Sequence, residues 1–218
     1  MQDESFSLGD LLALELHKYV EAVSEIVDRA QKELIIEKAL KKIEDTWSTL
    51  ALQFSPYPDA PDVFQFLVDD AVMEALEGDN MALQNMSNSK YVQGNAKFLE
   101  LVNIWQRKLG SVDSVLSTWT DVQRKWQALE SIFVGSADIR VQLPEDAKRF
   151  DGINQEFKDM MRGAPDITNV VEACNLDGRQ EKLDDLLGRL EMCEKALQDY
   201  LETKRIAFPR FYCESRAC

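Results

Sequence analysis

Hydrophobic residues recur at steps of three and four along most of this chain, the spacing of one face of an α-helix. The steps alternate most regularly over residues 111–133, where they form a heptad-like seam that needs partner helices. A second seam runs through the helix predicted for residues 179–206. The seam positions are Val112, Val115, Trp119, Val122, Trp126, Leu129 and Phe133 in the first helix, and Leu183, Leu186, Leu190, Cys193, Leu197 and Tyr200 in the second.

The N-terminal part of the chain also has a helical pattern, and it contains no Gly or Pro between Gly9 and Pro56. Its apolar stripe changes phase partway along, which indicates either one very long helix or two helices broken near residues 31–35. The positions of the first stripe are Leu12, Leu16, Tyr19, Val23, Ile26 and Ala30, and Leu34, Leu40, Ile43 and Trp47 continue it.

A different pattern follows, in which apolar and polar residues alternate over residues 50–54. The turn-forming sequence SPYPDAPD comes next, and the short apolar run from Val63 to Leu67 follows it. Alternation on one side of a Pro/Asp turn and an apolar run on the other predict a small β-hairpin near residues 50–68.

Turn and cap residues divide the rest of the chain. Gly110 is placed as a C′ glycine that ends one helix, and Pro144 suits the first turn of another. The predicted helices span residues 69–88, 96–109, 137–142 and 144–162, and the last of these has Phe150, Ile153, Phe157 and Met160 on its apolar face. The fold class is therefore mainly α, and short connections predict one elongated antiparallel helical bundle or rod.

The charge balance narrows the classes of partner. Lys and Arg total 25 against 39 Asp and Glu, so the net charge is −14. This argues against nucleic acid and against an anionic membrane surface as partners, because both require clustered basic residues. The first ten residues, MQDESFSLGD, lack the pattern of a secretory signal, and the four cysteines form no CxxC pair, so we expect free thiols in a reducing compartment.

Groups that could carry chemistry are scarce. His17 is the only histidine, and the nine glycines form neither a P-loop nor a GxGxxG pattern. We therefore expect no catalytic residue, no metal site and no cofactor. Several clusters have a structural explanation: core packing for Trp47, Trp105, Trp119 and Trp126, solvated helix faces for Asp69-Asp70 and Asp184-Asp185, and a helix dipole for Lys204, Arg205 and Arg210.

The order of residues in several tracts is more specific than any of these patterns. LESIFVGSADIRVQLPEDAKRFDGINQEFKDMM and EKLDDLLGRLEMCEKALQDYLETKRIAFPRFY resemble the linker region of dynein heavy chains. LALELHKYVEAVSEIVDRAQKELIIEKALKKIEDTW, ALQNMSNSKYV and WTDVQRKWQALESIF extend the resemblance over residues 6–212, in the family's order. The sequence is more similar to the axonemal members than to the cytoplasmic member.

The resemblance implies a function and partners. In this family the linker is a helical rod that lies across a ring of AAA+ modules and bends as the ring cycles through ATP. Residues 1–212 would be part of a linker domain, and residues 213–218, CESRAC, would be a divergent tail. The implied function is that of a non-catalytic lever, with the AAA+ ring of the same heavy chain and the intermediate and light chains as partners, in the axoneme of a cilium or flagellum.

A lever of long packed helices should bend at its connections. The candidate bend positions are Gly135, Gly163, Pro165 and Pro209, and we expect residues 163–175 to be the most mobile internal segment. The alternative function is that of a helical protein-interaction or scaffold module, in which exposed apolar seams bind another chain.

Overall fold

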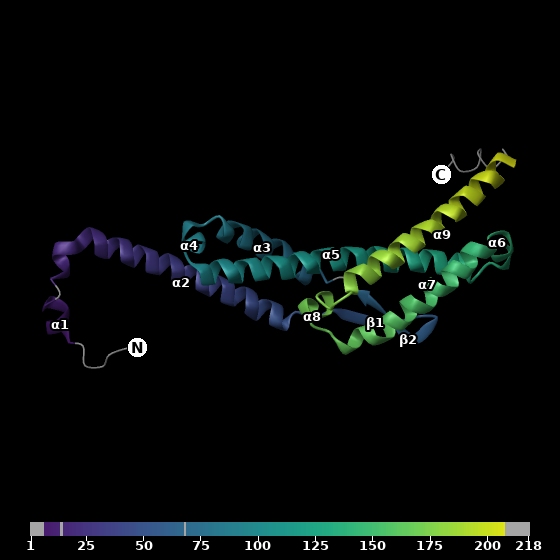
Figure 1. Ribbon diagram of the computed structural model, residues 1–218. Helices are drawn as coiled ribbons and strands as arrows, with labels where there is room; N and C mark the ends of the chain where they lie inside the picture. The colour runs from purple at the N-terminus through teal and green to yellow at the C-terminus, as the bar shows by residue number, and fades with distance from the viewer. Residues whose placement is uncertain (1–6, 14, 68, 208–218) are drawn as a thin grey trace, which may run out of the picture. The chain divides into compact units, whose positions relative to one another are not determined.

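A computed structural model describes residues 7–13, 15–67 and 69–207, and it confirms a mainly α fold with one β-hairpin (Figure 1). No helix in this part of the chain has both the length and the apolar character that a membrane crossing requires. The elements are α1 (Leu8–Ala13), the 3₁₀ helix η1 (Leu16–Tyr19), α2 (Val20–Thr49), β1 (Gln53–Tyr57), β2 (Ala60–Leu67), α3 (Asp70–Ser87), α4 (Lys90–Gln93), α5 (Ala96–Phe133), α6 (Ala137–Gln142), α7 (Pro144–Gly163), the 3₁₀ helix η2 (Ala164–Asp166), α8 (Val170–Cys174) and α9 (Arg179–Ala207).

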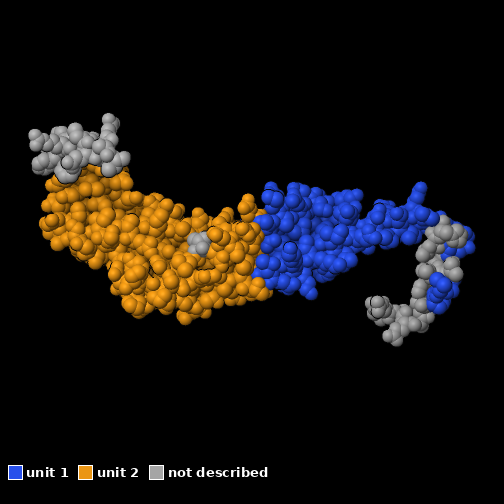
Figure 2. Space-filling model, turned by 180° about the vertical axis from the view of Figure 1, so that it is seen from behind, with its two compact units in different colours: residues 1–46, 78–106 blue, residues 47–77, 107–218 orange. Residues whose placement is uncertain are grey.

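The chain divides into two compact units (Figure 2). Unit 1 comprises residues 1–46 and 78–106, and unit 2 comprises residues 47–77 and 107–218. The helices α2, α3 and α5 contribute to both units. The expected boundary between residues 212 and 213 lies outside the described residues and stays a prediction.

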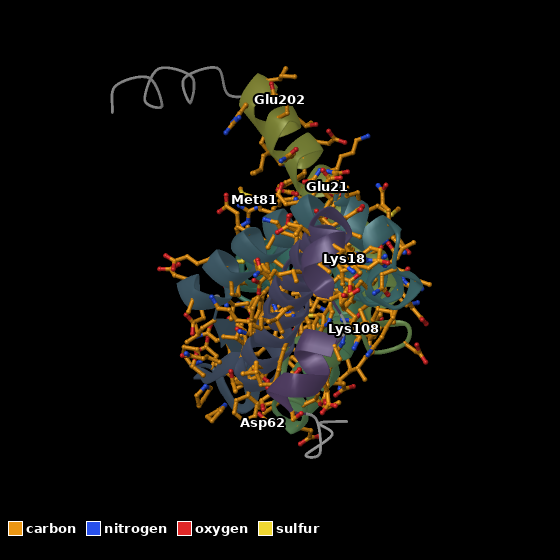
Figure 3. All side chains as sticks on the ribbon, turned by 90° about the vertical axis from the view of Figure 1, so that its left-hand side faces the viewer. Lys18, Glu21, Asp62, Met81, Lys108 and Glu202 are labelled. Carbon is orange, nitrogen blue, oxygen red and sulfur yellow. The ribbon has the colours of Figure 1, made fainter. Side chains whose placement is uncertain are left out.

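Unit 1 is built from most of α2, the second half of α3, α4 and the start of α5. Its core is formed by apolar side chains from these helices, whereas Glu21 of α2 and Met81 of α3 lie at its surface (Figure 3). Ser89 caps α4 by accepting a hydrogen bond from the Tyr91 amide. The buried core residues are Ile36, Leu40, Ile43, Leu83, Val92, Phe98 and Val102.

The core of unit 2 confirms the predicted seams. Every seam position of residues 111–133 is buried, and so are the seam positions of α9 up to Leu197, whereas Tyr200 is half-buried. The helix α7 packs against both α9 and β2, and its predicted face of Phe150, Ile153, Phe157 and Met160 is buried. Pro144 occupies the first turn of α7, as the sequence predicted.

The β-hairpin is confirmed, but its turn is tighter than the sequence suggested. The two strands pair antiparallel with Phe54 opposite Phe66, and the pairing is irregular between Pro56 and Tyr57. Only residues 58 and 59 form the turn, so most of the SPYPDAPD tract belongs to the strands. Proline is tolerated there because each strand of a two-stranded sheet has a free edge that needs no amide donor.

One open alternative is decided, and one predicted helix boundary is wrong. The helix α2 runs unbroken through residues 31–35, as the long-helix alternative predicted, and it begins at Val20, after Glu15, which has a left-handed φ of 47°. The helix α5 runs unbroken for 38 residues and passes through Gly110, which is exposed and is not a C′ residue. A glycine inside a helix costs only about 1 kcal/mol relative to alanine, so the packing of the flanking seam outweighs it.

Candidate functional site

Side chains that could do chemistry are not gathered in the described residues. No group of three or more His, Cys, Asp or Glu residues there is placed to hold a metal ion. Burial raises the pKa of the Cys174 thiol to about 12 and also raises the pKa of Cys193, which disfavours the nucleophilic thiolate form. Asp184 accepts a hydrogen bond from Gln180, and Asp185 pairs with Arg189.

A set of polar side-chain contacts holds the β-hairpin against the helices of unit 2. We call this set of residues the hairpin clamp. It joins the strands β1 and β2 to α5 and α7 through polar contacts that cross large distances in sequence. Its members are Tyr57, Gln65, Gln123, Gln127, Glu130 and Lys158.

Glu130 is the centre of the clamp, and only 8% of its surface is exposed. One of its carboxylate oxygens accepts a 2.6 Å hydrogen bond from the Tyr57 hydroxyl, and the other accepts a 2.6 Å bond from Lys158 Nζ. Burial, followed by the bond to Glu130, raises the pKa of Tyr57, so this hydroxyl stays protonated as a donor. A buried carboxylate with both oxygens engaged joins β1, α5 and α7 at one point.

An aromatic cluster lies beside this polar centre. The indole of Trp126 is 5.0 Å from the Tyr57 ring and 4.7 Å from the Phe157 ring, measured between centroids. Lys158 Nζ lies 5.5 Å from the centroid of Trp126, and the indole N–H donates to the side chain of Asn154. The ammonium group therefore has a carboxylate and an aromatic face as neighbours.

The outer edge of β2 is fastened by side-chain amides from α5. Gln123 accepts a hydrogen bond from the Phe66 amide through Oε1 and donates to the Phe66 carbonyl through Nε2, at 2.9 and 3.0 Å. One helical turn later, Gln127 donates to the Gln65 side chain at 3.0 Å. The two Gln123 bonds occupy the Phe66 backbone groups that a third strand would otherwise use.

A second set of contacts ties the chain entering the hairpin to the segment after α7. The Leu52 amide donates to the Thr168 carbonyl, and the Val170 amide donates to the Leu50 carbonyl. Asn169 donates through Nδ2 to the Trp47 carbonyl at 2.9 Å and also caps α8. The end of α2 and the start of α8 are therefore joined by main-chain bonds.

The candidate bend positions occupy different environments. Gly135 follows α5, and a Cβ at this position would lie 2.4 Å from the Ser131 carbonyl oxygen. Gly163 is the last residue of α7 and has open space around it, and Pro165 lies in η2. Pro209 lies outside the described residues. Thr168 and Val170 are held by main-chain hydrogen bonds to Leu52 and Leu50. Residues 163–167 are therefore the less constrained part of the predicted mobile segment.

Sequence reasoning did not identify the clamp. Glu130 is adjacent to seam residue Leu129, and its burial depends on a hairpin 73 residues earlier. Tyr57 lies inside the turn-forming tract, where a surface position is the usual expectation. A contact of this range has no local signal in a single sequence.

Comparison with known proteins identifies the family of this chain. Residues 1–216 match the family described as "Dynein heavy chain, N-terminal region 2". The chain belongs to the dynein heavy chains. The linker resemblance read from the sequence had named the same family.

The relatives are of axonemal type, as the sequence resemblance predicted. The chain is 68% identical over 217 residues to "Dynein beta chain, flagellar outer arm" of Chlamydomonas reinhardtii, 50% identical over 210 residues to human "Dynein axonemal heavy chain 9", and 46% identical over 215 residues to "Dynein beta chain, ciliary" of Tripneustes gratilla. These alignments cover 100%, 96% and 99% of this chain. The chain spans 5% of the length of each of these relatives.

Proposed function

We propose that this chain is a non-catalytic linker segment of an axonemal dynein heavy chain, where it transmits movement that an AAA+ ring generates with ATP. The ring would lie in the part of the heavy chain outside these 218 residues. The intermediate and light chains of a dynein complex are the further partners that this role implies, and the location is the axoneme of a cilium or flagellum. The family membership supports the motor context.

The hairpin clamp is the observation that carries the mechanical part of this proposal. A segment that transmits force must resist internal rearrangement, and packed cores with satisfied buried polar groups do so. In unit 2, one buried carboxylate ties a strand to two helices, and Gln123 holds the neighbouring strand. Long helices with buried seams, such as α5 and α9, add stiffness.

The test uses the full-length heavy chain that carries this segment, with Glu130→Ala introduced to weaken the clamp. We expect the ATP turnover of the ring to continue while microtubule gliding slows, because part of each stroke is lost in deformation of the segment. Glu100→Ala, an exposed position on the same helix α5, is the matched control and should leave both quantities unchanged. Gliding at the unaltered velocity by the Glu130 variant would contradict a force-bearing role for the clamp.

A second candidate function is that of a helical interaction module, and the end of η1 with the first part of α2 favours it. Tyr19 and Ile26, two positions of the apolar stripe, are 63% and 67% exposed, and Val20 and Val27 are also exposed. Exposed apolar stripes on helices are typical of binding faces. Sedimentation of the 218-residue chain at rising concentration tests this candidate: association that Ile26→Glu abolishes supports it, and a monomer at every concentration counts against it.

A further inference from the structure

A shallow groove in unit 2 lies between the first half of α3 and the middle of α5, whose ribbons run side by side in Figure 1. Its volume is about 300 Å³. Met73, which is 41% exposed, and Leu116, which is buried, contribute its apolar surface. The other lining residues are Asp113, Ser117, Thr120 and Asp121.

The polar groups around this groove are mainly hydrogen-bond acceptors. The Thr120 hydroxyl donates its proton to the Leu116 carbonyl of its own helix at 2.7 Å, so its lone pairs face outward. The carboxylates of Asp113 and Asp121 can only accept. Asp121 pairs with the exposed Arg124, whereas Asp113 makes no ion pair within the described residues. A partner of this groove would therefore have to supply donors.

The adjoining face of α3 is acidic over a long stretch of sequence. Residues 43–89 contain nine acids and no Lys, Arg or His. Asp70, Glu74 and Glu77 of α3 are exposed, and none of them forms an ion pair within the part of the chain that the structure describes. The nine acids are Glu44, Asp45, Asp59, Asp62, Asp69, Asp70, Glu74, Glu77 and Asp79.

The acids of α7 and α9 differ from those of α3 in how many of them form ion pairs. Most acids of α7, and Asp185 of α9, are paired within the chain with arginines of the same unit. These pairs are Asp146 with Arg149, Asp151 with Arg140, Asp159 with Arg162, and both Glu156 and Asp185 with Arg189. Of the acids in residues 43–89, Asp62 pairs with Arg162, whereas Asp70, Glu74 and Glu77 beside the groove that exposes Met73 form no ion pair within the described residues.

From this placement we propose that the groove between α3 and α5 docks a basic protein segment in which Lys or Arg residues flank an aliphatic or aromatic side chain. The apolar side chain would pack on Met73 and Leu116, and the cations would pair with Asp70, Glu74, Glu77 and Asp113. Charge complementarity selects this occupant, because an acidic or a nucleic-acid partner would meet repulsion here. The proposal does not depend on the force-transmission role of the chain.

The experiment measures binding of a fluorescein-labelled peptide, KKLKKLKK, to the full 218-residue chain by anisotropy at 150 mM salt. Two further peptides, KKSKKSKK and EELEELEE, separate the apolar and electrostatic contributions. We expect the leucine-containing basic peptide to bind more tightly than the serine peptide and the acidic peptide not to bind. Backbone amide shifts in an isotope-labelled sample should be confined to residues 70–77 and 113–121.

The deciding variant is Glu74→Lys/Glu77→Lys, and the matched control is Glu21→Lys/Glu25→Lys, which makes the same change in net charge on an exposed face of α2. We expect the first pair to weaken binding about tenfold and the control to change it by less than about twofold. Glu74→Gln/Glu77→Gln repeats the test without added charge if the lysine variant does not fold. Equal losses in both lysine variants, equal binding of the leucine and serine peptides, or no binding of KKLKKLKK would each overturn the proposal.

Discussion

The hydroxyl of Tyr57 donates a 2.6 Å hydrogen bond to the carboxylate of Glu130, although 73 residues separate them in the sequence. The bond joins a strand of the hairpin to a helix that supplies nine buried apolar residues to the core of unit 2. Its second partner, Lys158, comes from a third element. The fold of unit 2 therefore depends on a polar contact that no local pattern encodes.

Removing either partner of this bond should destabilise the chain to different extents. Tyr57→Phe removes one hydrogen bond and should lower the free energy of unfolding by about 1 kcal/mol. Glu130→Ala also leaves Lys158 without its carboxylate in a mostly buried position and should cost about 2–3 kcal/mol. Urea unfolding measures both values, and the double variant should be less destabilised than the sum of the two. Strict additivity would show that the two groups do not act together.

Two glycines should respond in opposite directions to substitution by alanine. Gly110 lies inside α5 with nothing within 4 Å of an added Cβ, so Gly110→Ala should stabilise the chain by about 0.5–1 kcal/mol. At Gly135 the added Cβ would lie 2.4 Å from the Ser131 carbonyl oxygen, and Gly135→Ala should cost about 1–3 kcal/mol. Thermal melts of the two variants provide the comparison. Loss of stability in Gly110→Ala would indicate that the helix ends there after all.

Hydrogen exchange tests which part of the connection after α7 moves. We expect the amides of Asp166 and Ile167 to exchange faster than those of Leu52 and Val170, because main-chain bonds to the Leu50–Leu52 stretch begin only at Thr168 and the Ile167 amide donates only a 3.4 Å bond to the Ala164 carbonyl. The amides of Leu52 and Val170 should exchange slowly, since each donates a bond that joins the two segments. Protection of residues 163–167 equal to that of α5 would remove this segment from the candidate bend positions.

Stability should fall at acidic pH because two carboxylates depend on arginine partners. The hydrogen bonds from Arg140 lower the pKa of Asp151, and those from Arg189 lower the pKa of Glu156. A depressed folded-state pKa contributes stability that is present above the unfolded-state pKa and is lost as pH falls through the folded-state value, so the loss should occur below about pH 4. The midpoints of urea unfolding, measured from pH 7 to pH 3, would show this loss of stability. Arg140→Gln should lower the midpoint at pH 7, and its difference from the parent chain should shrink as the pH falls towards 3, leaving the part due to the lost bond to the Phe133 carbonyl; a difference that does not change with pH would contradict the assignment.

Periodicity was a reliable guide wherever a helix buries a single seam. The strict steps of residues 111–133 identified a core that the structure confirms, and Pro144 located the start of α7, because proline fits the first turn and breaks later ones. The mainly α fold class and the hairpin followed from the same patterns. These features are local, so a short stretch of sequence contains the information that specifies them.

The errors occurred where tertiary packing overrides a local preference. Gly110 has the character of a helix terminator, but the seams on both sides of it are buried in continuous packing and α5 passes through it. The first apolar stripe has the spacing of a helix face, yet its positions Tyr19 of η1 and Ile26 of α2 are exposed. Glu130 was not recognised because burial of a single acid depends on partners far away in sequence.

The paired hydrogen bonds of Gln123 have a consequence for the behaviour of this segment when it is produced on its own. A two-stranded sheet offers open edges on which another copy could add a strand, the usual route to β-aggregates and fibres. The Gln123 side chain binds both main-chain groups of Phe66, near the end of this edge, so an added strand could not pair with Phe66. The one hairpin of the described residues is thereby partly protected against edge-to-edge pairing.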